Sequence, residues 1–373
     1  MENASHSPAL IAWLAFALAF AFGAIANRVN FCTMGAVTDV VHIGDWRRMR
    51  MWLLAIAVAI VGVAALEAAG QVDFGKTIYT TSRVPWVSCI VGGFLFGFGM
   101  TLASGCGSKT LIRLGAGNLK SLVVLIMLGI SAYMTLKGLF AVLRVNALDP
   151  FRFDTAAFGA ARSDLPAVVA ALAGGGSTIR VGVALAFAVA VAAFVLASRD
   201  FRTSGAMIAG GVVIGAIVVG GWYVTGHLGY IAEDPRTLEE AFVATNSGKA
   251  ESFSFVAPVA YLLELLLLWS DQSRIVTFGV AGVLGMLAGS AAVALATRTF
   301  QWEGFASIED LVNHIAGGVL MGFGGVTALG CTIGQGLSGI STLALGSCLA
   351  LAGIIAGCVT ALKYQYWRVE AAE

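Results

Sequence analysis

Long apolar runs separated by short polar stretches set the pattern of this chain. A helix needs about 20 apolar residues to cross a bilayer, and runs of that length recur from one end to the other. They predict nine membrane-spanning helices, at about residues 9–26, 51–69, 86–104, 119–142, 181–197, 205–224, 275–296, 308–329 and 341–362. The expected fold is an all-α integral membrane protein, with short helices of half-membrane length between some of the spans.

Composition supports a lipid environment and limits the classes of partner. Of 373 residues, 58% are hydrophobic and 12% are charged, and the net charge is +1. Soluble domains carry about 25% charged residues, so the bilayer is the expected solvent. No basic tract suggests nucleic acid. The run at 9–26 lacks a basic segment before it and a small-residue cleavage site after it, and we interpret it as a retained span.

One segment occurs twice. The first copy, Gly92 to Cys106, reads GGFLFGFGMTLASGC, and the second, Gly317 to Cys331, reads GGVLMGFGGVTALGC. The two copies agree at nine of fifteen positions without a gap. Each is an apolar helix that breaks at Gly-Cys and restarts as a short polar segment. Glycine-interrupted apolar helices at corresponding places in two halves indicate the binding site of a transporter.

A weaker echo extends the repeat. The segment 252–259 resembles 30–37, with Phe253 opposite Phe31 and Ser254 opposite Cys32. Each half then has four spans and two short helices, and one further span joins the halves. We expect a first repeat at 1–143, a connector with the joining span at 144–203, and a second repeat at 204–373. The odd joining span would invert the second repeat relative to the first.

Loop charges give the orientation by a small margin. We expect the N-terminus outside and the C-terminus inside. The basic residues that then lie inside are Arg47, Arg48, Arg50, Lys109, Arg113, Lys120, Arg199, Arg202 and Arg298. The connector at 144–178 carries an opposing set of nearly the same size. Glu67 and Glu264 interrupt apolar runs, and we expect them to pair with arginines.

The two breaks combine groups that suit a small anion with a soft atom. A helix that restarts presents free backbone N–H groups and a positive dipole end. Lys109 lies near Cys106, and a weak S–H donor suits sulfur. The alternative for Lys109 is that it extends to the lipid headgroups. The candidate binding residues are Cys32, Cys106, Cys331, Gly105, Gly107, Ser108, Lys109, Gly330, Thr332 and Gln335.

The cysteine pattern argues against other chemistry. The six cysteines lie in or beside apolar runs, and no CxxC occurs. This spacing favours neither a disulfide framework nor a zinc site. We interpret Cys89, Cys348 and Cys358 as small packing residues, and we expect no catalytic residue, metal ion or cofactor.

Three motifs carry a resemblance to a known family. The segments 30–36, 97–106 and 322–336, each with its cysteine, are similar to the signature segments of the YeeE/YedE sulfur-transport family. The resemblance covers nearly the whole chain. It implies a bacterial inner-membrane permease of nine spans in inverted repeats, whose characterised members take up thiosulfate. It also implies that Cys32, Cys106 and Cys331 line the pathway. Some relatives are associated with selenium or other sulfur species.

Three functions therefore stay open at this point. The first is a permease for thiosulfate or a similar sulfur-containing anion, with a small cytoplasmic sulfur-carrier protein as a candidate partner. The second is a membrane thiol oxidoreductase or sulfurtransferase that forms a cysteine persulfide. The third is a channel for a selenium compound or an unrelated small anion, in which the cysteines are incidental.

Overall fold

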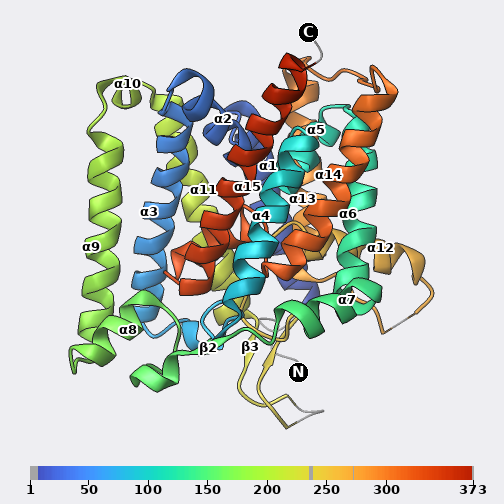
Figure 1. Cartoon of the computed structure of the whole chain (residues 1–373). Helices are drawn as coiled ribbons and strands as arrows, with labels where there is room; N and C mark the ends of the chain where they lie inside the picture. Colours follow the sequence, from blue (N-terminus) through green and yellow to red (C-terminus); the bar gives the residue numbers. More distant parts are fainter. Residues whose placement is uncertain (1–6, 235–237, 272, 372–373) are drawn as a thin grey trace.

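The structure is a computed structural model that describes residues 7–234, 238–271 and 273–371. Helices make up almost all of its regular structure, and the strands it describes are two residues long. The expected all-α architecture is confirmed. Residue 8 and residue 370 lie on opposite faces of the helical bundle, here called the N-terminal face and the C-terminal face (Figure 1).

The first third of the chain follows the predicted plan. Its elements are α1 (Pro8–Arg28), α2 (Thr33–Ile43), α3 (Arg47–Ala68), η2 (Phe74–Lys76), β1 (Arg83–Val84), α4 (Trp86–Leu102), α5 (Gly107–Gly115), α6 (Leu119–Lys137), α7 (Leu139–Leu143) and η3 (Arg144–Leu148). The short helices after the first and third spans are α2 and α5. The predicted end of the fourth span was wrong. That span stops at Lys137, because Gly138 takes an extended conformation and the chain restarts as α7.

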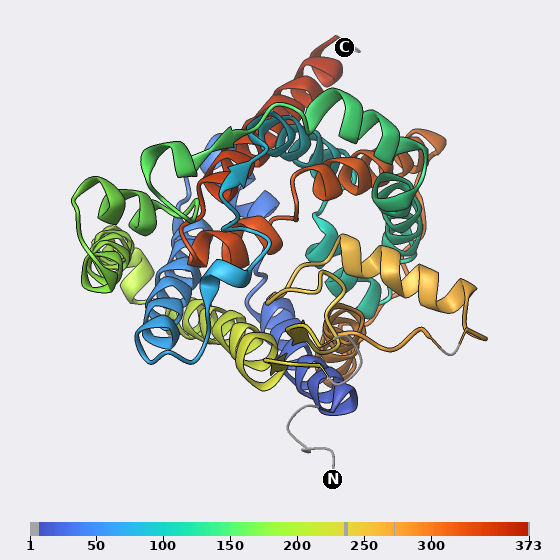
Figure 2. The same cartoon turned by 90° about the horizontal axis from the view of Figure 1, so that it is seen from below.

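The connector contributes a helix at the edge of the bundle. Its elements are β2 (Phe153–Asp154), η4 (Thr155–Phe158), α8 (Leu165–Leu172), α9 (Ser177–Leu196) and α10 (Arg199–Arg202). Strand β2 pairs antiparallel with β1. The joining span, α9, stands outside the other long helices (Figure 2). Only 11% of the residues in its most apolar stretch are buried. It therefore presents most of its surface to lipid.

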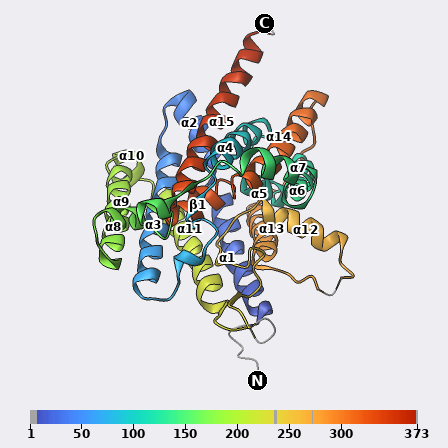
Figure 3. The same cartoon turned by 60° about the horizontal axis from the view of Figure 1, so that its bottom comes forward.

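The last part of the chain repeats the alternation of spans and short helices. Its elements are α11 (Gly205–Tyr223), η5 (Val224–Leu228), β3 (Tyr230–Ile231), β4 (Ala241–Phe242), α12 (Ala257–Leu267), α13 (Phe278–Ala296), α14 (Ile308–Thr327), η6 (Gly334–Gly339) and α15 (Leu345–Glu370). The short α12 follows the segment that echoes the first break. The end of α15 projects beyond the C-terminal face (Figure 3).

Nine helices of the described residues are long, namely α1, α3, α4, α6, α9, α11, α13, α14 and α15. In the described ranges, eight are long and apolar enough to cross a bilayer by length and composition. The ninth, α14, has 20 residues and carries Glu309 and Asp310 in its first turn. These two acidic residues lower its hydropathy. Its remaining turns lie against α4 and α6, as those of a spanning helix would.

The duplicated segments, α4 and α14, cross each other through their glycines. A Cβ atom built on Gly92 would lie 2.8 Å from the carbonyl oxygen of Gly324. A Cβ atom built on Gly99 would lie 2.7 Å from the carbonyl oxygen of Gly317. Such backbone approach requires small residues. The two contacts correspond, because Gly92 aligns with Gly317 and Gly99 aligns with Gly324.

The same correspondence holds for the neighbouring helices. In α4, Gly93 meets the carbonyl oxygen of Ala350 in α15. In α14, the matching Gly318 meets the carbonyl oxygen of Val124 in α6. Each repeated helix therefore packs between its copy and the last long helix of the opposite half.

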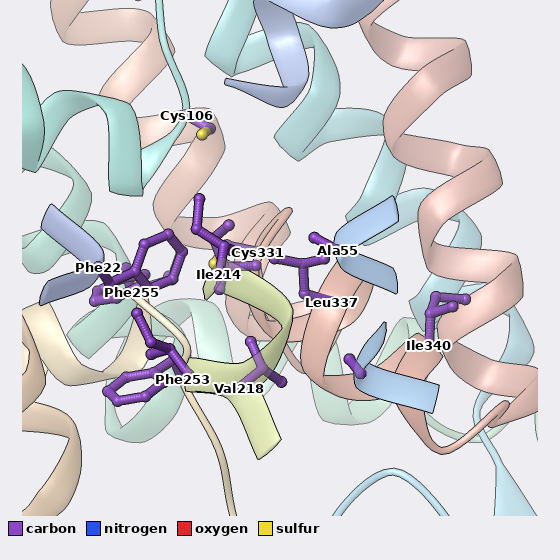
Figure 4. Packing of buried hydrophobic residues seen from close by; sticks show 14 of the residues in the cluster. Phe22, Ala55, Cys106, Ile214, Val218, Phe253, Phe255, Cys331, Leu337 and Ile340 are labelled. Carbon is purple, nitrogen blue, oxygen red and sulfur yellow. The ribbon is translucent and has the colours of Figure 1, made fainter. Parts of the chain in front are cut away.

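Aromatic side chains fill the middle of the bundle. The ring of Phe22 lies 6.3 Å from that of Phe31, 6.3 Å from that of Phe253 and 6.1 Å from that of Phe255. Phe22, Phe253 and Phe255 are almost fully buried (Figure 4). The matched residues Phe31 and Phe253 thus meet on the same ring, and the two segments that echo each other converge at the centre.

Two acidic residues within apolar runs are paired, as expected. Glu264 in α12 is 5% exposed, and its Oε1 lies 3.0 Å from both Lys137 Nζ and Arg274 Nη1. Glu67 in α3 lies 2.7 Å from Arg162. Cations beside these carboxylates offset the cost of removing them from water. The pairs join α12 to α6 and α3 to the connector.

Candidate functional site

Three helix breaks share one backbone design. Each helix ends in a residue with left-handed backbone, and the next N–H returns to a carbonyl five residues earlier, at 2.9, 2.8 and 2.7 Å. The left-handed residues, with φ of 53°, 56° and 60°, are Asn30, Ser104 and Leu329. This is the Schellman arrangement that closes a helix. The residues two positions later are Cys32, Cys106 and Cys331, so each break presents a cysteine at the same place.

The conformational break lies one residue earlier than the sequence indicated. The sequence suggested that Gly105 and Gly330 turn the chain, but Ser104 and Leu329 take the left-handed conformation. A side chain in that region costs about 1–2 kcal/mol. A leucine inside an apolar run gives no turn signal, and nothing in the sequence marked Leu329.

The glycines that follow leave room for neighbouring groups. A Cβ atom on Gly330 would lie 3.1 Å from the backbone nitrogen of Gln335, and one on Gly105 would lie 3.2 Å from Cγ of Lys109. A Cβ atom on Gly107 would lie 3.3 Å from the carbonyl oxygen of Phe255. The three predicted glycines therefore stand where the chain is closely packed around the cysteines.

Cys32 and Cys106 form one side of the site. Cys32 caps α2, and its thiol accepts a hydrogen bond from the Gly35 N–H at 3.4 Å. Cys106 precedes α5, and its Sγ lies 3.2 Å from the Ser108 hydroxyl. The two thiols are close enough to interact with each other. The structure thus brings the first and second cysteine motifs together.

Cys331 forms the other side. Its Sγ accepts a hydrogen bond from the Gly334 N–H at 3.4 Å and lies 3.9 Å from the Ser254 hydroxyl. Ser254 stands opposite Cys32 in the repeat, so the Ser254–Cys331 contact matches the contact between Cys32 and Cys106. Thr332 follows Cys331 and is buried, and its hydroxyl makes no hydrogen bond with the described residues.

Lys109 turns toward the first break. Its ammonium donates a hydrogen bond to the side-chain oxygen of Asn30, two residues before Cys32. The positive charge is therefore held beside the cysteine pair, not extended along the lipid surface. Lys109 and Ser108 lie in the first turn of α5, where free backbone N–H groups add to the positive potential.

Gln335 lies four residues after Cys331 in the second break, whereas Lys109 lies three residues after Cys106 in the first. Its side-chain amide donates to the carbonyl oxygen of Ala328. Its Oε1 is buried and accepts no hydrogen bond from the described residues. The polar side chain near the second break is therefore neutral, whereas the one near the first break is a cation.

The three break cysteines are buried in this conformation. Cys331 is 0% exposed, Cys106 is 1% exposed and Cys32 is 8% exposed. A cavity of about 170 Å³ opens on the N-terminal side of Cys331. Its lining includes Ser254 and Gly330, and also four residues that the sequence did not indicate: Tyr79, Arg144, Glu251 and Tyr261. No motif marks these four, since they come from loops and from different helices.

Glu251 is a titratable residue in the wall of this cavity. Burial raises the pKa of its carboxyl to about 7, although the Ser247 hydroxyl donates to it at 2.8 Å. A group with this pKa changes its charge near neutral pH. Glu251 and Arg144 both line this cavity, which therefore combines a carboxyl of variable charge with a positively charged guanidinium.

The comparisons with known proteins agree with this architecture. The model of the family described as sulphur transport matches residues 28–360. The chain belongs to this family. It is 27% identical to the thiosulfate transporter TsuA of Escherichia coli (strain K12) over 93% of this chain and 92% of that protein. It is 25% identical to the thiosulfate transporter TsuA of Spirochaeta thermophila over 92% of this chain and 96% of that protein.

The other cysteines of this sulphur transport protein lie outside the breaks. Cys358 in α15 accepts a hydrogen bond from the Thr101 hydroxyl at 3.3 Å. Cys89 in α4 is buried against Ala328 and Ala350. Cys348 is exposed at the start of α15. All six cysteines are free thiols. Cys89 and Cys358 are buried within helices, as packing residues are, whereas Cys348 is exposed.

Proposed function

We propose that this membrane protein is a permease that takes up thiosulfate, or a similar small sulfur-containing anion, across a bacterial inner membrane. One observation carries the proposal. Three helix breaks of the same backbone design each present a cysteine at the centre of the bundle, with a cavity leading to one of them. The names of the two relatives support thiosulfate as the anion.

In the proposed mechanism the thiols act as successive donors. The substrate enters from the N-terminal side, where Cys331 donates its S–H to the terminal sulfur. Cys106 and then Cys32 accept the ion as the helices around them adjust. Only hydrogen bonds form and break, and the substrate is released unchanged. Thiols suit this role because sulfur is a weak partner, so that no step holds the ion too tightly.

The oxygen end of the ion needs different groups. Backbone N–H groups at the start of α5 and the ammonium of Lys109 would stabilise its negative charge. Ser108, Thr332 and Gln335 would supply neutral polar contacts on either side of the narrow part. The three glycines Gly105, Gly107 and Gly330 would let the ion approach the backbone.

We interpret the bundle as two inverted repeats, residues 1–143 and 204–373, joined by 144–203. The matched contacts of Gly92 with Gly324 and of Gly317 with Gly99 support this interpretation. The distribution of basic residues in the loops favours an orientation with the N-terminal face outside. A small sulfur-carrier protein on the cytoplasmic side, which would consume the product, stays a prediction.

Uptake of radiolabelled thiosulfate by proteoliposomes tests the proposal. We expect saturable uptake that excess unlabelled thiosulfate abolishes and that sulfate or selenite reduces less. Mass spectrometry of the protein after uptake separates the alternatives. A persulfide on Cys106 would support a sulfurtransferase, and equal uptake of unrelated anions would support a general anion channel.

A further inference from the structure

A second cavity adjoins the first on the N-terminal face. It has a volume of about 190 Å³ and lies between β1, η3, the loop that follows η3 and the end of α14. Three arginines line it: Arg83, Arg144 and Arg152. Arg144 and Leu329 line both cavities, so the two are neighbours with shared walls.

The charges around this outer cavity do not balance. Arg144 Nε lies 3.3 Å from Asp149 Oδ2, and Arg83 Nε lies 3.7 Å from Asp154 Oδ2. Arg152 donates its Nε–H to the backbone carbonyl of Asp149 at 3.2 Å and forms no ion pair within the described ranges. Asp149 is the one carboxylate that lines the cavity in that same part of the chain. The walls therefore carry a net positive charge.

A buried hydroxyl without a partner points to the same place. Thr327, the last residue of α14, lines this cavity and is 1% exposed. Its Oγ1 has no hydrogen-bond partner among the described residues. Leaving such a group unpaired is costly, so native proteins rarely do so without a reason. Arg144 Nε likewise makes an ion pair without a hydrogen bond.

We propose that this cavity is an outer binding subsite for a small doubly charged oxyanion, held by Arg144, Arg152 and the Thr327 hydroxyl. A guanidinium can donate two parallel N–H bonds to two oxygens of such an ion, and the hydroxyl adds a further hydrogen bond. The proposal rests on the proposed function. The ion would bind here first and then pass Arg144 and Leu329 into the inner cavity that leads to Cys331.

The chemistry of the walls defines what this subsite distinguishes. No thiol lines the cavity in the part of the chain that the structure describes. The subsite therefore recognises charge and oxygen atoms, and the cysteines behind it recognise sulfur. Sulfate should compete for the outer subsite without being carried past Cys331. Selection for sulfur would then be a second step, made after the anion has been concentrated at the entrance.

Transport kinetics in proteoliposomes of neutral phosphatidylcholine test the subsite. We expect Arg152→Gln to raise the KM for thiosulfate about tenfold, which corresponds to about 1.4 kcal/mol, with the maximal rate unchanged. Thr327→Val preserves the shape of the side chain and removes the hydroxyl. Its KM for thiosulfate should also exceed that of the wild type, while its melting temperature should stay level or increase. Arg180→Gln is the matched control. It removes one arginine near the start of α9 that lines neither cavity, and it should transport like the wild type.

Each outcome decides the proposal. A KM unchanged in both Arg152→Gln and Thr327→Val, with normal wild-type uptake, would overturn the outer subsite and leave the permease intact. No uptake by the wild type would overturn both. If Arg152→Gln does not fold, Arg152→Lys keeps the charge without the planar fork and should still raise KM. A change in KM that appears only in vesicles containing phosphatidylglycerol would assign the arginines to lipid headgroups and overturn the subsite.

Discussion

Gly92 and Gly324 meet backbone to backbone where α4 crosses α14, with a distance of 2.8 Å from a built Cβ on Gly92 to the Gly324 oxygen. The same contact recurs between the aligned residues Gly317 and Gly99. Both helices end a few residues beyond this crossing, at Ser104 and Leu329. The crossing therefore sets how far apart the two cysteine-bearing breaks lie.

Substitution at this crossing should destabilise the protein. We expect Gly92→Ala to lower the melting temperature in detergent, because overpacking a close contact costs about 1–3 kcal/mol. Gly182→Ala in α9 is the control, since nothing lies within 4 Å of a Cβ there. It should leave the melting temperature unchanged or slightly higher. Equal melting temperatures for the two variants would contradict the close crossing.

Removal of the break cysteines should impair transport selectively. We expect Cys106→Ala to abolish thiosulfate uptake, and Cys331→Ala and Cys32→Ala to reduce it severely, because each loses a donor to sulfur. Cys348→Ala and Cys358→Ala change thiols outside the breaks and should transport normally. Radiolabel uptake at equal protein density measures this. Full activity of all five variants would contradict the proposal that the thiols bind the ion in succession.

Lys109 and Cys106 should recognise different properties of the substrate, Lys109 its charge and Cys106 its sulfur atom. Lys109→Gln removes a positive charge beside the break, and every anion should then compete more weakly by a similar factor. The N-terminus of α5, which favours an anion by about 0.3–2 kcal/mol, is unchanged in this variant. Cys106→Ser keeps a hydroxyl donor, and should weaken thiosulfate more than sulfate. Competition assays with both anions compare the variants. Normal uptake by Lys109→Gln would mean that backbone N–H groups alone stabilise the charge of the anion.

Much of this architecture was readable from the sequence, because it depends on local patterns. Apolar runs gave the spans, and two copies of one segment gave the positions of Cys106 and Cys331. The contact of Cys32 with Cys106 was not given by any pattern. It depends on how α2 and α5 begin next to each other in space. Ser254 aligns with Cys32, and Cys331 aligns with Cys106. The structure was needed to show that Ser254 and Cys331 lie close to each other.

The outer cavity had no sequence signal. Arg83, Arg144 and Arg152 belong to short elements around the connector, and Thr327 lies at the end of a helix more than 170 residues further on. A cavity formed by such separate segments leaves no spacing to recognise. The left-handed Leu329 was hidden for another reason: its side chain continues the apolar run, although its backbone ends the helix.

Glu251 should make uptake depend on pH. Its pKa of about 7 lies above the ordinary value of 4.5 because the carboxyl is buried. Below about pH 7 the carboxyl is neutral, and above it the carboxylate repels an anion in the same cavity. Tyr79, Tyr261 and Arg144 share this cavity, and only Arg144 among them is charged near neutral pH. We expect uptake to fall as pH rises from about 6 to about 8.

The variant Glu251→Gln separates this effect from a proton gradient. With equal pH on both sides of the vesicle, the variant should transport at the low-pH rate of the wild type throughout the range, because its amide does not ionise. Thiosulfate stays a dianion in this range, so the substrate contributes no change of its own. A wild-type decline that persists in Glu251→Gln would assign the titration to another group. Uptake that rises with pH would contradict the repulsion, since a carboxylate facing an anion has the opposite sign.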